Sequence, residues 1–162
     1  MQIAIISDTH LPRGARRLPT DCVERLMAAD LILHAGDLMA LSVLHELESY
    51  GRVIAVQGNV DDAAVRAALP EVASVNAAGA RIAMVHDAGA AKGRLARLRR
   101  RFPDAQAVVF GHSHIPLHER DEDGFQIFNP GSPTERRRSP HHTMGMARAH
   151  DGRLTFELIV LG

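Results

Sequence analysis

Near the start of the chain stands Ile3-Ala4-Ile5-Ile6-Ser7-Asp8-Thr9-His10, a short apolar run that ends in an acid and a histidine. The run has no polar alternation and is rich in β-branched isoleucine, which predicts a strand buried on both faces in a parallel sheet. Ligands of open α/β sheets bind outside the carboxyl ends of the strands. Asp8 and His10 share a face if the pleat continues, so this strand end could provide two ligands of a metal ion.

Four further apolar runs end in the same way, at residues of types that bind metal ions. The runs lie at 31–33, 53–56, 82–85 and 108–110, and the residues that follow them are Asp37, Asn59, His86, His112 and His114. Asp, Asn and His are common in turns, so any one of these residues could follow a strand by chance. Five runs that all end in this way in one small chain are harder to explain by chance. We therefore interpret the set as one site.

The first half of the chain alternates strands with helices, which predicts parallel strands joined by right-handed crossovers. A helix at about 20–29 is expected to be capped by Thr20 or Asp21 and to direct Val23, Leu26 and Met27 to the core. A second helix at about 39–49 should stop at Gly51. A third helix should begin at Asp61 or Asp62 and end before Pro70.

The second half has a different pattern. A hairpin is predicted for 72–76 and 81–85, followed by a helix at about 90–101. Short strands are then expected at 115–120, 125–129, 142–150 and 154–161, with turns at Asp121-Glu122-Asp123-Gly124 and Asp151-Gly152. We expect the strands after the His112-Ser113-His114 turn to be antiparallel, and the chain to form a single α/β domain over residues 1–162.

Composition narrows the function classes. The chain has 19 basic residues (Lys and Arg) and 19 acidic residues (Asp and Glu), so its formal net charge is zero. No overall electrostatic field therefore attracts nucleic acid or an acidic membrane. Cys22 is the only cysteine, which excludes an intrachain disulfide and favours a small buried residue. No signal peptide and no membrane-length apolar run stand out, so we expect a cytoplasmic protein that does not associate with membranes.

The candidate ligands combine hard oxygens with imidazoles and include no thiolate. This mixture suits Mn²⁺, with Ni²⁺, Fe²⁺, Co²⁺ or Zn²⁺ as alternatives, rather than Ca²⁺ or a closed cysteine zinc site. Seven ligands exceed what one ion with an open position needs, but they fit two ions that share a carboxylate. Two such ions can hold a bridging hydroxide and stabilise phosphoryl oxygens. The predicted reaction is therefore hydrolysis of a phosphate ester.

These blocks, taken in order, resemble the calcineurin-like metallophosphoesterases, in particular the small YfcE-like phosphodiesterase branch: Asp8-Thr9-His10, Gly36-Asp37, Gly58-Asn59, His86 and Gly111-His112-Ser113-His114. The resemblance implies two mixed β-sheets packed as a sandwich and flanked by helices. It implies one metal held by Asp8, His10, Asp37 and His114, and a second metal held by Asp37, Asn59, His86 and His112. Asp37 would bridge the two, and the catalytic assignment falls on Asp37, Asn59 and His112.

Substrate contacts are predicted at two places. Arg13 lies in the basic loop that follows His10, where a guanidinium could meet an anionic ester, although a solvated loop explains it equally well. Asn129 begins the sequence Asn129-Pro130-Gly131-Ser132, which matches a loop that the family has near its site. We expect the substrate to be a small-molecule phosphate ester, most simply a small or aryl diester.

The chain departs from the family pattern where many relatives have a catalytic histidine, because Val60 follows the ligand Asn59. Met39 and Ala40 stand where other members have a second acid, and a family His-Gly-His is reduced here to His86-Asp87-Ala88. None of these changes removes a predicted ligand. The residue that protonates the leaving group is left open, with His34 and Asp87 as candidates.

Two other functions compete with this one. The first is a non-catalytic binding scaffold of the same fold, like the retromer subunit, which the complete ligand set argues against. The second is a nucleic-acid enzyme, which would use the arginines of 94–101 and 136–138 but gains little support from a neutral chain with few aromatic residues. A homo-oligomer is left open.

Overall fold

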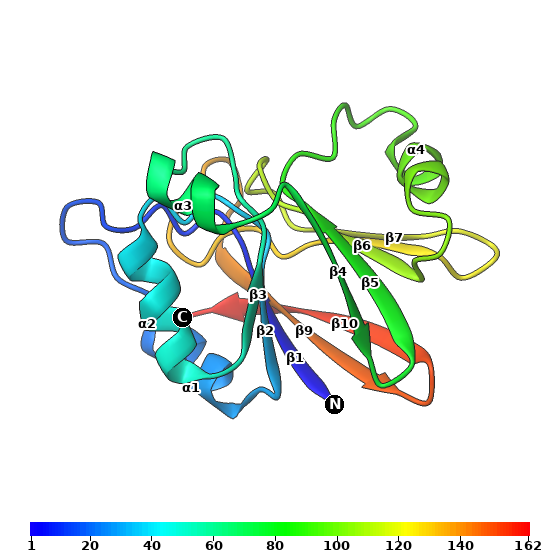
Figure 1. Ribbon diagram of the computed structural model, residues 1–162, viewed down its shortest axis with the longest axis horizontal. Helices are drawn as coiled ribbons and strands as arrows, with labels where there is room; N and C mark the ends of the chain where they lie inside the picture. Colours follow the sequence, from blue (N-terminus) through cyan, green and yellow to red (C-terminus); the bar gives the residue numbers. More distant parts are fainter.

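The computed structural model describes residues 1–162. Two five-stranded β-sheets form the centre of the molecule (Figure 1). The first sheet has the order β10-β9-β1-β2-β3, with strands Arg153–Leu161, His142–His150, Gln2–Ile6, Leu31–His34 and Val53–Ala55. The second has the order β4-β5-β6-β8-β7, with strands Val72–Ala77, Ala80–Val85, Ala107–Val109, Gln126–Asn129 and Leu117–Arg120. Both sheets contain parallel and antiparallel pairs, so the predicted sandwich of mixed sheets is confirmed.

The four helices cover the outer faces of the sandwich (Figure 1). Their bounds are Thr20–Ala28 for α1, Leu41–Tyr50 for α2, Ala63–Ala68 for α3 and Arg94–Arg101 for α4. Side chains of α1, α2 and α3 pack on the first sheet, and Leu98 of α4 packs on the second. None of these helices combines the length and apolarity that crossing a bilayer would require.

Strand β1 is buried on both faces, as its unbroken apolar run predicts. Ile3 and Ile5 belong to the core between the two sheets, whereas Ala4 and Ile6 belong to the core beneath the helices. Each fully buried isoleucine stabilises the fold by roughly 1.5–3 kcal/mol. Parallel pairing of β1 with β2 and of β2 with β3 brings three carboxyl ends to one edge of the sheet.

The second half of the chain is not uniformly antiparallel, which corrects the prediction. Strand β6 pairs in parallel with both β5 and β8. Helix α4 is the crossover connection between β5 and β6. Strand β7 lies beyond β8 and is antiparallel to it, so β8 enters between β6 and β7 in the same direction as β6. The tight hairpins β4–β5, β7–β8 and β9–β10 are antiparallel as expected.

Helices α1 and α2 differ from the sequence expectation in their details. Pro19 is the N-cap of α1 and has no side-chain cap bond, so neither Thr20 nor Asp21 caps this helix. Met27 is 62% exposed, because the buried side of α1 is formed by Cys22 and Leu26. Gly51 does follow α2, but its φ of 168° is extended backbone that any residue can adopt.

The remaining helix ends show one correct prediction and one late start. Asp62 caps α3 by accepting from the backbone N of Val65 at 2.8 Å. Helix α4 begins at Arg94, four residues later than the periodicity predicted, after Gly93 in a left-handed conformation.

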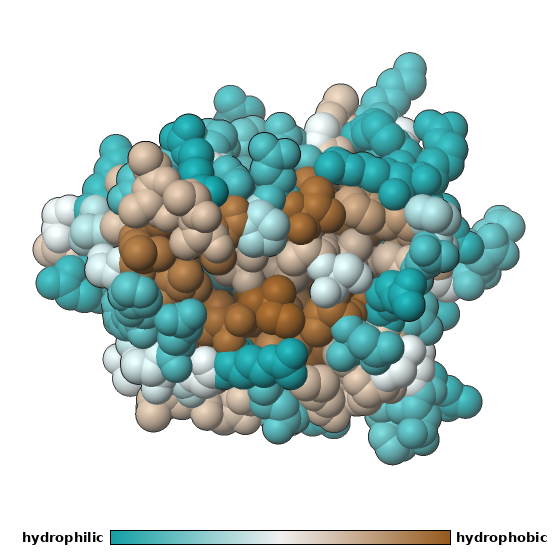
Figure 2. All heavy atoms as spheres, in the orientation of Figure 1, coloured by the Kyte–Doolittle hydropathy of each residue, from teal (hydrophilic) through white to brown (hydrophobic).

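An apolar strip lies on the face of the molecule drawn in Figure 2, in the region of β3 and β4 and with polar side chains around it. Val53, Ile54 and Ala73 are partly buried against the cores beneath, and Val72 is 39% exposed. The strip is therefore the margin of the hydrophobic core where the two sheets meet at their edge strands.

Candidate metal centre

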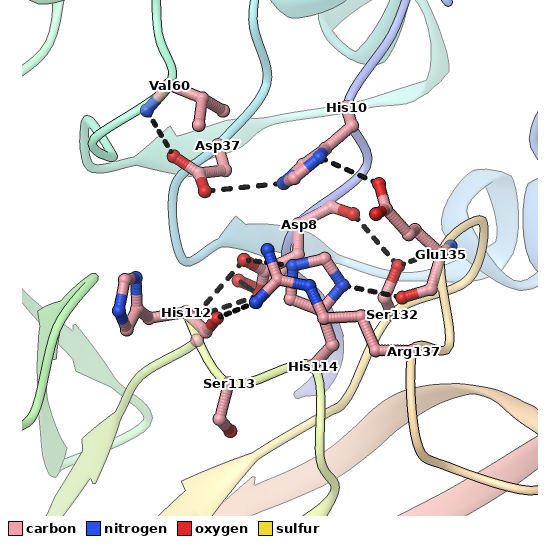
Figure 3. A network of polar contacts seen from close by, with 12 residues as sticks. Asp8, His10, Asp37, Val60, His112, Ser113, His114, Ser132, Glu135 and Arg137 are labelled. Atoms are coloured by element: carbon pink, nitrogen blue, oxygen red, sulfur yellow. Dashed lines mark hydrogen bonds and ion pairs between the residues drawn. The ribbon is translucent and has the colours of Figure 1, made fainter.

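The loops that follow five strands meet at one end of the sandwich. They follow β1, β2, β3, β5 and β6 and carry all seven predicted ligands: Asp8, His10, Asp37, Asn59, His86, His112 and His114. Backbone bonds join the loops, since the N of Asp8 donates to Gly36 and the N of Gly111 donates to His86. Figure 3 shows Asp8, His10, Asp37, His112 and His114 converging from these loops.

Five of the seven predicted ligands have an unusual backbone conformation. Asp8, His10, Asp37, His112 and His114 all have positive φ, between 47° and 68°. The pleat therefore does not continue past β1, and the expectation that Asp8 and His10 share a face through it is wrong. They converge because left-handed turns direct both side chains inward. Asp and His tolerate this conformation better than most residues, and strain of this kind is concentrated at functional sites.

Asp37 lies between two histidines. Its Oδ2 is 3.3 Å from Nε2 of His10 and 3.2 Å from Nε2 of His86. Two groups of donor atoms, each within 4.8 Å of one another, could hold a metal ion: Asp8 with His10 and His114, and Asp8 with Asp37 and His86. Asp8 belongs to both groups, and Asp37 faces a histidine of each group.

Asn59 and His112 complete the side of the centre that contains His86. Oδ1 of Asn59 lies 2.9 Å from Nδ1 of His112 and 3.1 Å from Nε2 of His86. His112 is exposed, whereas His10, His86 and His114 are buried. The centre is therefore open to solvent on the His112 side.

Two orphaned nitrogens show that the residues fit a cation. Nε2 of His10 and Nε2 of His114 are buried without a hydrogen-bond partner, and Nε2 of His114 is 3.3 Å from Oδ1 of Asp8. Burial lowers the pKa of His114 to about 4, so its ring is neutral near pH 7. Because Nδ1 of His114 donates to the carbonyl of Glu135 at 2.5 Å, its Nε2 presents a lone pair to Asp8. A divalent cation would relieve this contact between two lone pairs.

The pKa values of the two carboxyl groups in the centre, Asp8 and Asp37, shift in opposite directions. Burial raises the pKa of Asp8 to about 6, although the charge of His86 opposes the rise. Burial also acts to raise the pKa of Asp37, but contacts from His10 and His86 outweigh it and hold this pKa below its ordinary value. Asp37 therefore keeps its negative charge in acid, as a ligand shared by two cations requires.

Small residues and a buried acid allow the loops to approach so closely. A Cβ on Gly58 would lie 2.1 Å from Oδ1 of Asp37, and one on Gly111 would lie 1.9 Å from Oγ of Ser7. Asp61 accepts from the backbone N of Met39 and of Gly58, both at 2.6 Å. Asp61 thus joins the Asp37 loop to the Asn59 loop and is not the cap of α3.

A family model for the calcineurin-like phosphoesterase superfamily domain matches residues 1–152. The chain belongs to this superfamily. A protein of Methanothermobacter thermautotrophicus, described as a probable metallophosphoesterase, is 34% identical over 168 residues, which cover all of this chain and 94% of that protein. Membership and the gathered ligands together identify a metallophosphoesterase domain.

Solved structures share its fold. Wild-type Vps29 of Entamoeba histolytica, crystallised with Zn²⁺, matches with a TM-score of 0.78 and 20% identity over 99% of each chain. A structure described as a novel archaeal phosphodiesterase matches with a TM-score of 0.73 and 20% identity, over 98% of this chain and 100% of that one. At this identity the matches establish the fold of the metallophosphoesterase and not its substrate.

The predicted substrate residues of this metallophosphoesterase lie in different surroundings. Arg13 has a side chain that is 62% exposed, near the centre and 3.7 Å from Oε2 of Glu135. Asn129 is fully buried, and its amide nitrogen donates to the carbonyl of Gly111 at 2.9 Å while its oxygen accepts from the N of Gly131. These bonds make Asn129 a support for the His112 turn, and its burial disfavours contact with a substrate.

Several residues near the metallophosphoesterase centre escaped the sequence analysis. Oγ of Ser132 donates to the carbonyl of Asp8 at 2.8 Å, and Oε2 of Glu135 is 2.9 Å from Nδ1 of His10. Arg137 donates to the carbonyl of His112 at 3.4 Å. Ser132 was visible as part of the loop that begins at Asn129. Arg137 stood out only as one of the arginines of 136–138, which were considered for nucleic acid. Glu135 gave no signal, because it follows no strand and lies beside a run of charged residues.

Proposed function

We propose that this metallophosphoesterase hydrolyses phosphate diesters, foremost small or aryl diesters, with two divalent transition metal ions of which Mn²⁺ is the leading candidate. The observation that carries the proposal is the position of Asp37 Oδ2 between Nε2 of His10 and Nε2 of His86. When bound, two such ions supply an activated water and positive charge for the phosphoryl oxygens.

In this proposal the candidate ligands form two groups, each of which would hold one metal ion; we call them holding groups. Asp8, His10 and His114 would hold one ion and Asn59, His86 and His112 the other, with Asp37 shared. Asp8, His10 and His114 are all buried, so an ion held by this group would be shielded from solvent. The group that contains exposed His112 faces solvent, where an ester can enter.

Arg137 is the guanidinium that we assign to the substrate phosphate. It makes no ion pair with a carboxylate, whereas Oε2 of Glu135 is occupied by Arg16 at 2.9 Å and approached by Arg13 at 3.7 Å. Figure 3 shows Arg137 reaching across His114 toward His112, at the open side of the centre. A guanidinium in this position can donate two parallel hydrogen bonds to phosphoryl oxygens.

A groove beside the second holding group has room for the organic part of an ester. Its volume is about 430 Å³, and Asn59 and His86 line it together with Arg66 and Arg101. Small-molecule sites commonly have volumes of about 300–1,000 Å³. The groove also contains Glu71 and Asp87, so its charge is balanced and it favours no strongly anionic substituent.

Turnover of model esters tests the proposal. Purified protein is assayed with Mn²⁺, Ni²⁺, Fe²⁺, Co²⁺ or Zn²⁺ on bis(p-nitrophenyl) phosphate and on p-nitrophenyl phosphate. We expect metal-dependent cleavage of the diester that a chelator abolishes and that Asp8→Asn removes. Asp104→Asn is the control, because this acid is 82% exposed and pairs only with Arg81.

The same assay covers the substrate contact and the scaffold alternative. Arg137→Ala should raise KM, whereas Arg138→Ala, which changes an exposed neighbour, should not. If the protein binds metal but cleaves no ester with any of these ions, the phosphodiesterase proposal fails and a binding scaffold becomes the better explanation.

A further inference from the structure

Glu135 contacts both histidines of the buried holding group, through two different parts of the residue. Its carboxylate Oε2 is 2.9 Å from Nδ1 of His10, and its backbone carbonyl accepts from Nδ1 of His114 at 2.5 Å. Figure 3 shows the residue between the two rings, on the side away from Asp37.

The loop that carries Glu135 is bonded to the end of β1. Oγ of Ser132 accepts from the N of Glu135 at 2.9 Å and donates to the carbonyl of Asp8 at 2.8 Å. Oγ1 of Thr134 donates to the carbonyl of Thr9 at 2.6 Å. Because the loop is tied to the segment that contains His10, Glu135 is held in register with the ring that it contacts.

The carboxylate of Glu135 is also fixed from the solvent side. Arg16 donates to its Oε2 at 2.9 Å. The carboxylate side chain is 23% exposed, so most of it is enclosed by the loop and by these arginine and histidine side chains. Glu135 therefore presents a fixed acceptor oxygen to His10.

These contacts define which nitrogen of each ring carries the proton. A carbonyl and a carboxylate only accept, so Nδ1 is the nitrogen that carries the proton in the neutral form of each ring. The lone pairs are then on Nε2, and these are the two buried atoms without a hydrogen-bond partner. An acceptor behind a ligating histidine fixes its tautomer and orientation and increases its basicity.

We propose that Glu135 is a positioning residue for this metal position: its carboxylate sets the tautomer and orientation of His10, and its carbonyl does the same for His114. The inference rests on the proposed function, since it assumes that the centre holds metal. A substitution at position 135 removes the carboxylate but leaves the carbonyl. Side-chain variants should therefore disturb His10 and spare His114.

Metal binding measured without turnover tests the proposal. Titration of metal-free protein with Mn²⁺ or Co²⁺ should reveal two binding steps. We expect Glu135→Ala to weaken one step by about 10–100-fold, the usual effect of losing such a supporting group, and to leave the other step unchanged. Glu135→Gln, which keeps a neutral acceptor of the same size, should lose less affinity and serves if the alanine variant does not fold.

Two controls separate positioning from a general effect on the fold. Glu119→Ala removes an exposed acid of β7 and should not change either step. In ¹⁵N-histidine spectra of the Zn²⁺-loaded protein, Glu135→Ala should shift the Nδ1 resonance of His10 and leave that of His114 in place. His114 is thus an internal control in the same molecule.

The outcomes distinguish this inference from the function on which it rests. If wild-type protein binds two metals and cleaves diesters while both Glu135 variants keep both affinities and the His10 resonance, the positioning role is wrong and the function stands. Equal shifts of His10 and His114 would also overturn it, because they would indicate a collapsed loop. If wild-type protein binds no metal, both proposals fail.

Discussion

One oxygen of Asp37 faces a histidine from each half of the centre, and we propose Asp37 as the shared ligand. Asp37→Asn keeps the size of the side chain but removes the charge that both ions would share. We expect a loss of metal affinity at both positions of at least about 100-fold, more than for a supporting residue. Turnover should fall further than for any other single ligand change. Metal content and turnover of the purified variant check this.

Asp104→Asn is the matched control for that variant, since it changes an acid outside the centre. An Asp37→Asn protein that retained two metals and near-normal turnover would show that Asp37 is not the shared ligand.

Val60 leaves the centre without the proton donor that many relatives have at this position. Its side chain is 39% exposed, and only its backbone N reaches the centre, donating to Asp37 Oδ1 at 2.9 Å. His34 cannot substitute, because it is fully buried, burial lowers its pKa to about 3, and both ring nitrogens are engaged with Thr9 and Gly36. Asp87, which lines the groove, is the remaining candidate.

We therefore expect turnover to depend steeply on the pKa of the leaving group, so that esters of acidic phenols are cleaved far faster than alkyl esters. General acid catalysis is typically worth about 10²–10⁴-fold, and Val60→His should recover part of it for alkyl esters. Rates across a series of aryl and alkyl esters measure the dependence. A shallow dependence in the unmodified protein that steepens in Asp87→Asn would instead assign the proton to Asp87.

Helix α3 is the element whose start the sequence predicts most directly. Its six residues are too few to be stable alone, and Asp62 satisfies one of its free N–H groups. We expect Asp62→Ala to lower the free energy of unfolding by about 1 kcal/mol, as the loss of an N-cap does. Urea unfolding measures the change, and Asp62→Ser should restore most of it.

Metal affinity should be the same in Asp62→Ala as in the unmodified protein, since the carboxylate that joins the ligand loops belongs to Asp61. A large loss of metal from the Asp62 variant would mean that the cap also holds the Asn59 loop.

Strand β1 and the loop after it both determine where Asp8 and His10 lie. Its burial between two cores fixes where the chain emerges at the sheet edge, while the left-handed turns after Ile6 decide where Asp8 and His10 point. The strand therefore sets the position of the two residues, and the loop sets the direction of their side chains.

At the scale of the whole molecule, the buried histidines make stability depend on pH. His34 has a pKa of about 3 in the folded protein, against about 6.5 when unfolded. The unfolded chain therefore takes up this proton first as the pH falls. The stabilisation present above pH 6.5 is lost between about pH 6.5 and 3, by up to about 1.4 kcal/mol per pH unit.

We expect His34→Gln, measured by urea unfolding at several pH values with a chelator present, to lose stability less steeply below pH 6.5 than the unmodified protein does. The chelator excludes pH-dependent metal binding as a cause. Parallel curves for the two proteins would show that His34 does not resist protonation in the folded state.

The candidate ligands that sequence reasoning found share one property, which is that each follows an apolar run. Asp8, Asp37, Asn59 and His86 can be found in this way because strands of a parallel arrangement end at a common edge. Glu135 could not be found, since its partner His10 is distant in the chain and nothing near position 135 signals the contact.

By itself, the amino-acid sequence determined the strands, the first-half parallel order and the residues that could bind metal, because apolar runs and their polar ends are local patterns. Only the tertiary structure decided that β8 joins β6 in parallel, that Asn129 is a buried support and that Glu135 stands behind two histidines. These features depend on contacts between segments far apart in the chain. Their energies come from packing and burial, which no short stretch of sequence contains.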